Sequence, residues 1–170
     1  MIESRDGRRV VITGVGVVAP CGIGVAAFWD GLAKPIEPSV FRRVTDFDPE
    51  QWGLRRVEAR RLDRFAQFGL AASADALADA GLLSTPGPAP VDGGDRVGVL
   101  IGSGICGALS WEQQALVRHD KGERSVSPLT VPMVMPNAAA AAVSMRWGLY
   151  GPCETVATSC ATGTHAIANA

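Results

Sequence analysis

The chain has 170 residues, of which 47% are hydrophobic and 19% are charged, and its formal net charge at pH 7 is −1. This length allows one domain with a hydrophobic core, and the near-neutral charge argues against binding to nucleic acid. We recognise neither a secretory leader nor an apolar run that could span a membrane, so we expect a cytoplasmic protein. The cysteines lack metal-ligand spacing, and we expect no metal site and no cofactor; they are Cys21, Cys106, Cys153 and Cys160.

Residues 8–18 form a continuous β-branched run, which is typical of a buried strand, and a short helix is predicted over Ala26–Leu32. Gly14 and Gly16 partly match the fingerprint of a dinucleotide-binding loop. That fingerprint requires a second strand ending in an acidic residue, whereas residues 34–38 are rich in proline and do not form a strand pattern. Dinucleotide binding is therefore disfavoured at this motif.

Residues 34–55 are predicted to be a loop, and residues 55–80 a single long helix with one broad apolar face. Its first turns carry five arginines: Arg55, Arg56, Arg60, Arg61 and Arg64. Two interpretations of this basic surface stay open. It is either a solvated face balanced by Glu58 and Asp63, or a docking surface for an acidic protein partner.

Pro86–Gly94 is predicted to be a surface loop, followed by a second buried strand over Arg96–Ile101 and a helix over Leu109–His119. Between that strand and helix lies a complete GxGxxG motif, residues 102–107. The stretch about 20 residues further on, 121–125, is polar and turn-like, so the acidic partner of a dinucleotide site is absent here too.

Ser127–Pro132 is predicted to be extended, because prolines bound it. Pro136 suits the first position of a helix over Asn137–Trp147, whose alanines we expect to pack closely against a neighbouring helix. A turn at Gly151 and Pro152 then leads into a last strand.

That strand runs through Cys160 into small residues and an apolar run typical of a helix. A thiol at a helix N-terminus is stabilised as thiolate, the nucleophilic form, although a lone cysteine is more often a small buried hydrophobic residue. His165 lies five positions further on and faces another side of the helix, so we interpret it as a packed or capping residue. His119, near a helix end, has no catalytic role that we recognise.

The segment from Thr155 to Ala170, TVATSCATGTHAIANA, resembles the nucleophile motif of the β-ketoacyl-acyl carrier protein synthases. These are condensing enzymes of the thiolase-like superfamily, and the chain is most similar to the elongating type II subclass. Further similarity lies in RRVVITG, LDRFAQFG, IGSGICG and SPLTVP. The resemblance implies an α/β, thiolase-like layered fold with a mixed sheet between helices. Residues 1–170 would form only its N-terminal half.

The resemblance also assigns roles to residues. Cys160 takes an acyl group from an acyl carrier protein, and Ile105 lines and gates the acyl pocket. Thr130 and Val131 close the pocket of the partner subunit across the interface of a homodimer. The two basic residues that meet the carrier protein are Arg60 and Arg61.

The implied reaction is a decarboxylative Claisen condensation of the acyl group with malonyl-carrier protein in fatty-acid synthesis. In the family, two histidines, a lysine and a phenylalanine-glycine loop complete the site, and all follow the position of Ala170. We therefore expect the chain to be part of a longer protein, and the 170 residues alone not to condense.

Three alternatives remain open. A type II polyketide ketosynthase would show the same motifs. A non-catalytic chain-length or scaffold subunit has the same fold but usually lacks the cysteine, so Cys160 counts against it. Saturable binding of NAD would revive a nucleotide-binding module.

Overall fold

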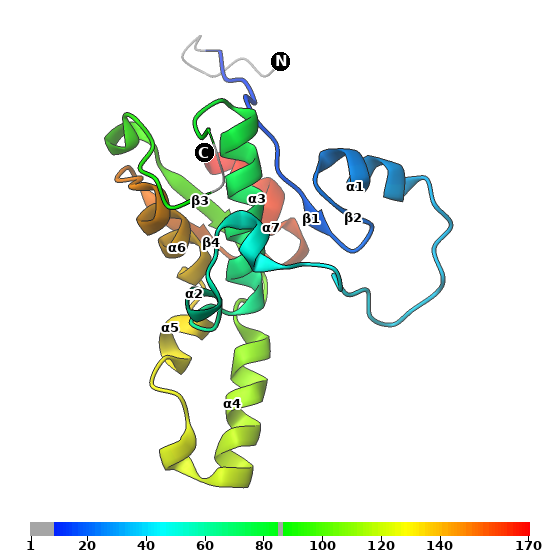
Figure 1. The fold of residues 1–170 in the computed structure, drawn as a ribbon, viewed down its shortest axis with the longest axis vertical. Helices are drawn as coiled ribbons and strands as arrows, with labels where there is room; N and C mark the ends of the chain where they lie inside the picture. Colours follow the sequence, from blue (N-terminus) through cyan, green and yellow to red (C-terminus); the bar gives the residue numbers. More distant parts are fainter. Residues whose placement is uncertain (1–8, 85–86) are drawn as a thin grey trace.

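A central layer of two helices and two parallel strands organises the computed structural model, which describes residues 9–84 and 87–170. Helices α3 (Arg64–Asp79) and α6 (Ala138–Trp147) lie against strands β3 (Val99–Gly102) and β4 (Cys153–Val156) (Figure 1). Arg8 and Pro86, which bound two of the predicted segments, lie outside the described residues.

Strands β3 and β4 pair in parallel, with Val99 opposite Cys153 and Gly102 opposite Val156. Because successive strand residues face opposite sides, Val99 and Ile101 point into the core with α3 and α6. Gly102 faces the other side, where it lies against helix α7 (Thr162–Asn169). Helices therefore cover both faces of this sheet, and the predicted α/β layering is confirmed.

Close contact between α3 and α6 depends on small side chains. A Cβ added at Gly69 of α3 would come within 3.4 Å of the Ala139 Cβ of α6. Trp147 is fully buried at the end of α6 and donates its ring N–H to the Gly87 carbonyl, 3.0 Å away. The expected close packing of the alanines is confirmed. The helix starts at Ala138 after Asn137 in the cap position, so the prediction that Pro136 is its first residue was wrong.

The predicted strand over residues 8–18 was wrong for most of its length. Only Val18–Ala19 form a strand, β1, which pairs antiparallel with β2 (Gly22–Ile23) before helix α1 (Val25–Leu32). Ile12 is 82% exposed, whereas a large apolar residue in a buried strand would be shielded from solvent. Within the described residues no strand pairs with residues 10–17, and β-branched residues form a strand only where a partner strand completes the hydrogen bonds.

The predicted helix over residues 55–80 is two helices, α2 (Arg56–Ala59) and α3. The break has a local cause: Asp63 is extended, and its carboxylate accepts a hydrogen bond from the Phe65 N–H and so starts α3 afresh. The preceding segment, predicted to be a loop, includes a 3-10 helix, η1 (Pro49–Trp52), and buries Phe47 against Trp52.

An arm extends from the body beyond this core (Figure 1). It consists of α4 (Ala108–Lys121), the 3-10 helix η3 (Glu123–Ser125) and α5 (Thr130–Val134). The prediction that Ser127–Pro132 is extended was wrong from Thr130 onward. A proline in the first turn of a helix lacks only an N–H that would have no helical partner, so Pro132 is compatible with α5.

Two further 3-10 helices, η2 (Gly94–Arg96) and η4 (Ser159–Ala161), precede β3 and α7. In residues 9–84 and 87–170, no helix combines the length and the apolar character needed to cross a membrane.

Candidate active site

Cys160 lies in the turn that joins β4 to α7. The strand ends at Val156, and η4 forms a single 3-10 turn around the cysteine before α7 begins at Thr162. The Thr158 N–H donates to the Thr162 hydroxyl at 2.7 Å, which closes this turn on itself. The structure thus places an exposed thiol at the entrance of a helix, the position that the sequence predicts.

The backbone before the cysteine is strained. Ser159 has φ of +51°, in the left-handed region that non-glycine residues rarely occupy. Such a conformation persists only where the surrounding structure holds it, and strained residues gather at functional sites. The bond between Thr158 and Thr162 supplies part of that constraint.

His165 does not form a pair with the thiol. Its Nδ1 atom lies 3.3 Å from the Thr158 hydroxyl oxygen, and its ring is half-buried. The ring therefore forms a hydrogen bond with the segment before η4, in agreement with the interpretation of His165 as a packed or capping residue.

The GxGxxG motif is explained by close packing of the backbone. A side chain on Gly102 would collide with the Thr162 backbone, and one on Gly104 would lie 3.4 Å from the Ser159 carbonyl oxygen. A side chain on Gly107 would collide with the backbone of α5. Sequence reasoning disfavoured a nucleotide at this motif but missed its structural role, which is to bring the loop against the cysteine turn.

Ile105 lies in that glycine loop and is 80% exposed. The next residue, Cys106, has φ of +60°, and its N–H donates to the Ser103 hydroxyl at 3.1 Å. The loop thus has a strained, hydrogen-bonded geometry of its own, beside the turn that carries Cys160.

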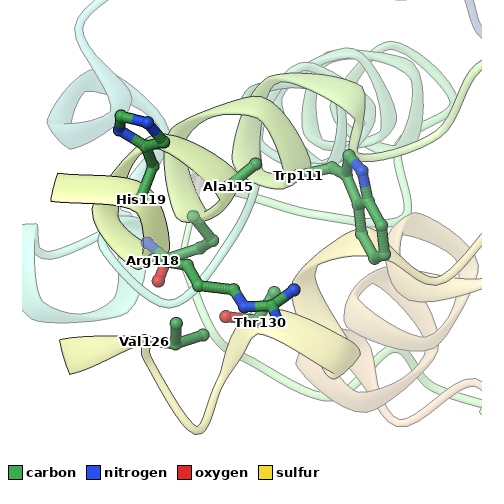
Figure 2. Close-up of a pocket in the computed structure, with 7 residues that line it drawn as sticks. Trp111, Ala115, Arg118, His119, Val126 and Thr130 are labelled. Carbon is green, nitrogen blue, oxygen red and sulfur yellow. The ribbon is translucent and has the colours of Figure 1, made fainter. Parts of the chain in front are cut away.

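Thr130 and Val131 are the first two residues of α5. Thr130 is half-buried and borders a hollow of about 450 Å³ between α4 and residues 126–130 (Figure 2). Trp111, Arg118 and His119 contribute further walls, and neither Cys160 nor Ile105 lines it; Val131, 64% exposed, is likewise outside it. The structure therefore brings the glycine loop to the cysteine but does not join Thr130 to the same cavity.

The five arginines do not act as one surface. Arg64 lies over the rings of Phe47 and Phe68, with its guanidinium carbon 4.8 Å and 4.9 Å from their centroids. Arg55 pairs with Glu58 at 2.7 Å, and this hydrogen bond lowers the pKa of the Glu58 carboxyl below its ordinary value.

Arg56 pairs with Glu50 at 3.2 Å. Arg60 and Arg61 are exposed in the turn between α2 and α3, and neither forms an ion pair with any residue in 9–84 or 87–170. Of the predicted basic surface, these two side chains are the ones left available to a partner.

The described part of the chain holds no group of three or more His, Cys, Asp or Glu side chains arranged to bind a metal ion. All four cysteines are free thiols.

Comparison with known sequences decides the family. The profile of the beta-ketoacyl synthase N-terminal domain matches residues 36–170, which is most of the chain. The chain belongs to the beta-ketoacyl synthase family. It is 36% identical to 3-oxoacyl-[acyl-carrier-protein] synthase 2 of Staphylococcus aureus (strain COL), a match that covers 96% of the chain and 41% of that protein. The protein of the same name from Synechocystis sp. is 37% identical, over 99% of the chain and 42% of its own length.

Solved structures give the same result for the fold. A ketosynthase complex of a type II polyketide synthase with its acyl carrier protein superposes with a TM-score of 0.78 at 26% identity. The match covers 94% of the chain and 46% of the solved one. A beta-ketoacyl synthase from Burkholderia phymatum superposes with a TM-score of 0.68 at 23% identity, over 94% of the chain and 42% of its own. The predicted thiolase-like fold is confirmed, and the chain spans about two fifths of the length of its curated relatives.

Proposed function

We propose that the protein is a β-ketoacyl-acyl carrier protein synthase in which Cys160 is the nucleophile. The observation that carries this proposal is the exposed thiol in the turn before α7, with the glycine loop packed against it. The small residues that follow this thiol, Ala161 and Gly163, leave room for a thioester.

The reaction has two stages. The Cys160 thiolate attacks the thioester carbonyl of the acyl-carrier protein; a bond forms from its sulfur to the acyl carbon, and the carrier thiol leaves with a proton. Malonyl-carrier protein then loses carbon dioxide. The resulting carbanion attacks the acyl-enzyme, forming a carbon–carbon bond and releasing the cysteine sulfur as thiolate, which regains its proton. The second stage needs groups that stabilise negative charge on two carbonyl oxygens: that of the decarboxylated malonyl thioester and that of the acyl-enzyme under attack.

We assign those groups to a part of the protein beyond these 170 residues, which would then be the N-terminal half of the synthase domain. Support comes from the relatives, of which the chain covers 41% and 42%. The 170 residues alone should therefore form no condensation product. Turnover of malonyl-carrier protein by them would contradict this division.

For the acyl chain we propose a pocket that passes Ile105, because this side chain is exposed on the loop that touches the cysteine turn. Thr130 and Val131 would complete the pocket of a second subunit in a cytoplasmic homodimer. The exposure of Val131 and of Trp111 on the projecting arm supports such an interface.

Arg60 and Arg61 are proposed to dock the carrier protein, because neither is engaged by an acidic residue within the described part of the chain. The single charge reversals Arg60→Glu and Arg61→Glu should each raise the KM for the carrier protein about tenfold, an effect that weakens at high salt. Arg56→Glu is the matched control, since Arg56 already pairs with Glu50. An equal effect of all three reversals would point to net charge rather than docking.

The proposed function is tested with the full-length protein, an acyl-carrier protein and malonyl-carrier protein. Mass spectrometry of the carrier should show a β-ketoacyl product extended by two carbons. Cys160→Ala should abolish it, whereas Cys153→Ala, which removes another exposed thiol, should leave the rate unchanged. Product formation by the Cys160→Ala variant would overturn the proposal.

A type II polyketide ketosynthase is the second candidate. It is favoured by the solved ketosynthase complex with a TM-score of 0.78, which is described as bound to a hexaketide. The two functions separate in the same assay, because a polyketide enzyme extends a poly-β-keto chain repeatedly and a fatty-acid enzyme stops after one extension.

A further inference from the structure

Asp63 is a buried carboxylate that serves two helices at once. Asp63 is only 3% exposed to solvent. One oxygen, Oδ1, accepts from the Phe65 N–H at 3.1 Å, and the other, Oδ2, accepts from the Ser110 N–H at 2.8 Å. Phe65 lies in the first turn of α3 and Ser110 in the first turn of α4.

Helix α4 has no cap of its own. Gly107 occupies the cap position and offers no side chain, so the first N–H groups of α4 need partners from elsewhere. The carboxylate of Asp63 supplies one, and its negative charge lies at the positive end of both helices. Asp63, which is 47 residues away from Ser110 in the sequence, thus acts as an N-cap for α4.

The helix held in this way directly follows the loop that carries Ile105. At its start the loop is held by the sheet, since the Ser103 N–H donates to the Val156 carbonyl at 3.1 Å. At its end it must hold Cys106 at φ of +60°, a conformation that relaxes if either end is free. The bond between Asp63 and Ser110 fixes that second end.

The carrier-docking arginines share this anchor. Arg60 and Arg61 lie three and two residues before Asp63, respectively, in the short turn between α2 and α3. The same buried carboxylate therefore sets the position of the proposed docking turn and of the proposed pocket loop.

We propose that Asp63 is a positioning residue that fixes Ile105 relative to Cys160 and so sets which acyl chain lengths the cysteine accepts. This proposal rests on the proposed function, because it assumes that Cys160 takes an acyl group and that Ile105 borders the acyl pocket. Asp63 touches neither the substrate nor the thiol; it acts through the first turn of α4.

The variant that separates the two bonds is Asp63→Ser. Serine is a good N-cap and keeps the bond to the Phe65 N–H, but its single oxygen on a short side chain leaves Ser110 without an acceptor. Acylation of the full-length protein is measured with carrier thioesters from four to sixteen carbons. We expect the ratio of rates between the best and the poorest chain length to fall about tenfold, the effect of losing one buried hydrogen bond.

Asp48→Ser is the matched control. Asp48 caps η1 through the same kind of bond, from the Glu50 N–H at 3.0 Å, but its side chain accepts no hydrogen bond from α4. Its chain-length profile should match that of the unmodified protein. A ratio of rates within one sample does not depend on how much protein is folded, so an unchanged profile for Asp63→Ser would overturn the proposal.

A second variant and an experiment on the unmodified protein cover the case in which Asp63→Ser does not fold. Ser110→Pro removes the N–H whose hydrogen bond Asp63 accepts, together with the Ser110 hydroxyl, in the first turn of a helix, where proline is tolerated. It should shift the profile in the same direction. In the unmodified protein the Ser110 amide should exchange slowly with deuterium. Rapid exchange would overturn the proposal. Absence of any acyl-enzyme in the unmodified protein would instead contradict the proposed function.

Discussion

Two stretches of the chain look alike in sequence but have different structures. Residues 10–16 and residues 97–104 are both apolar runs with several β-branched residues, and each ends in two glycines spaced two apart. In the second, Val99 is 7% exposed and lies in a parallel pair with β4. In the first, Val11 is 62% exposed, and none of residues 10–13 pairs with a described strand.

The difference shows what a strand pattern does and does not specify. β-branched side chains favour extended backbone, but a strand forms only beside another strand that completes its hydrogen bonds. The glycines differ for a related reason. Gly14 and Gly16 let the first run lie closely on the backbone of α3, whereas Gly102 and Gly104 let the second lie against the cysteine turn.

The largest expected effect comes from filling one of these close contacts. Gly102→Ala would drive a methyl group into the Thr162 backbone, so either β3 or the Cys160 turn must move. We expect acylation of Cys160 in the full-length protein to slow about a hundredfold. The comparison variant is Gly16→Ala, whose methyl group would collide with the Ala72 backbone of α3 and not with the cysteine turn; it should slow acylation less than about twofold. Equal losses would contradict the distinction between the two glycine pairs.

A smaller effect is expected from trimming one valine in each run. Val99→Ala leaves a void in the core, so its free energy of unfolding should fall by about 2 kcal/mol. Val11→Ala, at an exposed position, should change it by less than about 0.5 kcal/mol. Urea denaturation of the 170-residue chain measures both. If Val11→Ala were as costly as Val99→Ala, the first run would have to be buried in solution.

The smallest effect concerns the hydrogen bond that ties the first run to α3. The Val15 N–H donates to Asp79 Oδ2 at 2.9 Å, at an exposed site. Asp79→Ala should lower the free energy of unfolding by less than about 1 kcal/mol and speed hydrogen exchange at the Val15 amide. Unchanged exchange would show that the bond does not hold this run in place. Asp75→Ala is the control: Asp75 lies on the same helix as Asp79, but its carboxylate accepts from the Trp52 ring N–H and not from the first run.

Much of the architecture follows from local sequence. The helices α1, α4 and α6 lie within one or two residues of their predicted bounds, because their apolar spacing and flanking glycines are local signals. The strand-to-helix turn at Cys160 was predictable for the same reason. The resemblance of residues 155–170 to a known motif identified the chemistry that such a turn can perform.

What the sequence did not reveal depends on contacts between distant residues. The break at Asp63 was missed because helical periodicity continues through it, while the carboxylate is held by Ser110, which is remote in the chain. The packing of the half-buried Arg64 side chain was missed because it depends on the rings of Phe47 and Phe68, which lie in two different segments. The five arginines in the first turns of the predicted helix therefore overestimated the free basic surface.

The central claim is that Cys160 takes the acyl group, and one measurement tests it most directly. The full-length protein is incubated with acyl-carrier protein alone, digested, and analysed by peptide mass spectrometry. The account predicts an acyl thioester on the peptide that contains Cys160 and none on those containing Cys106 or Cys153. An acyl group on another residue, or on none, would contradict it.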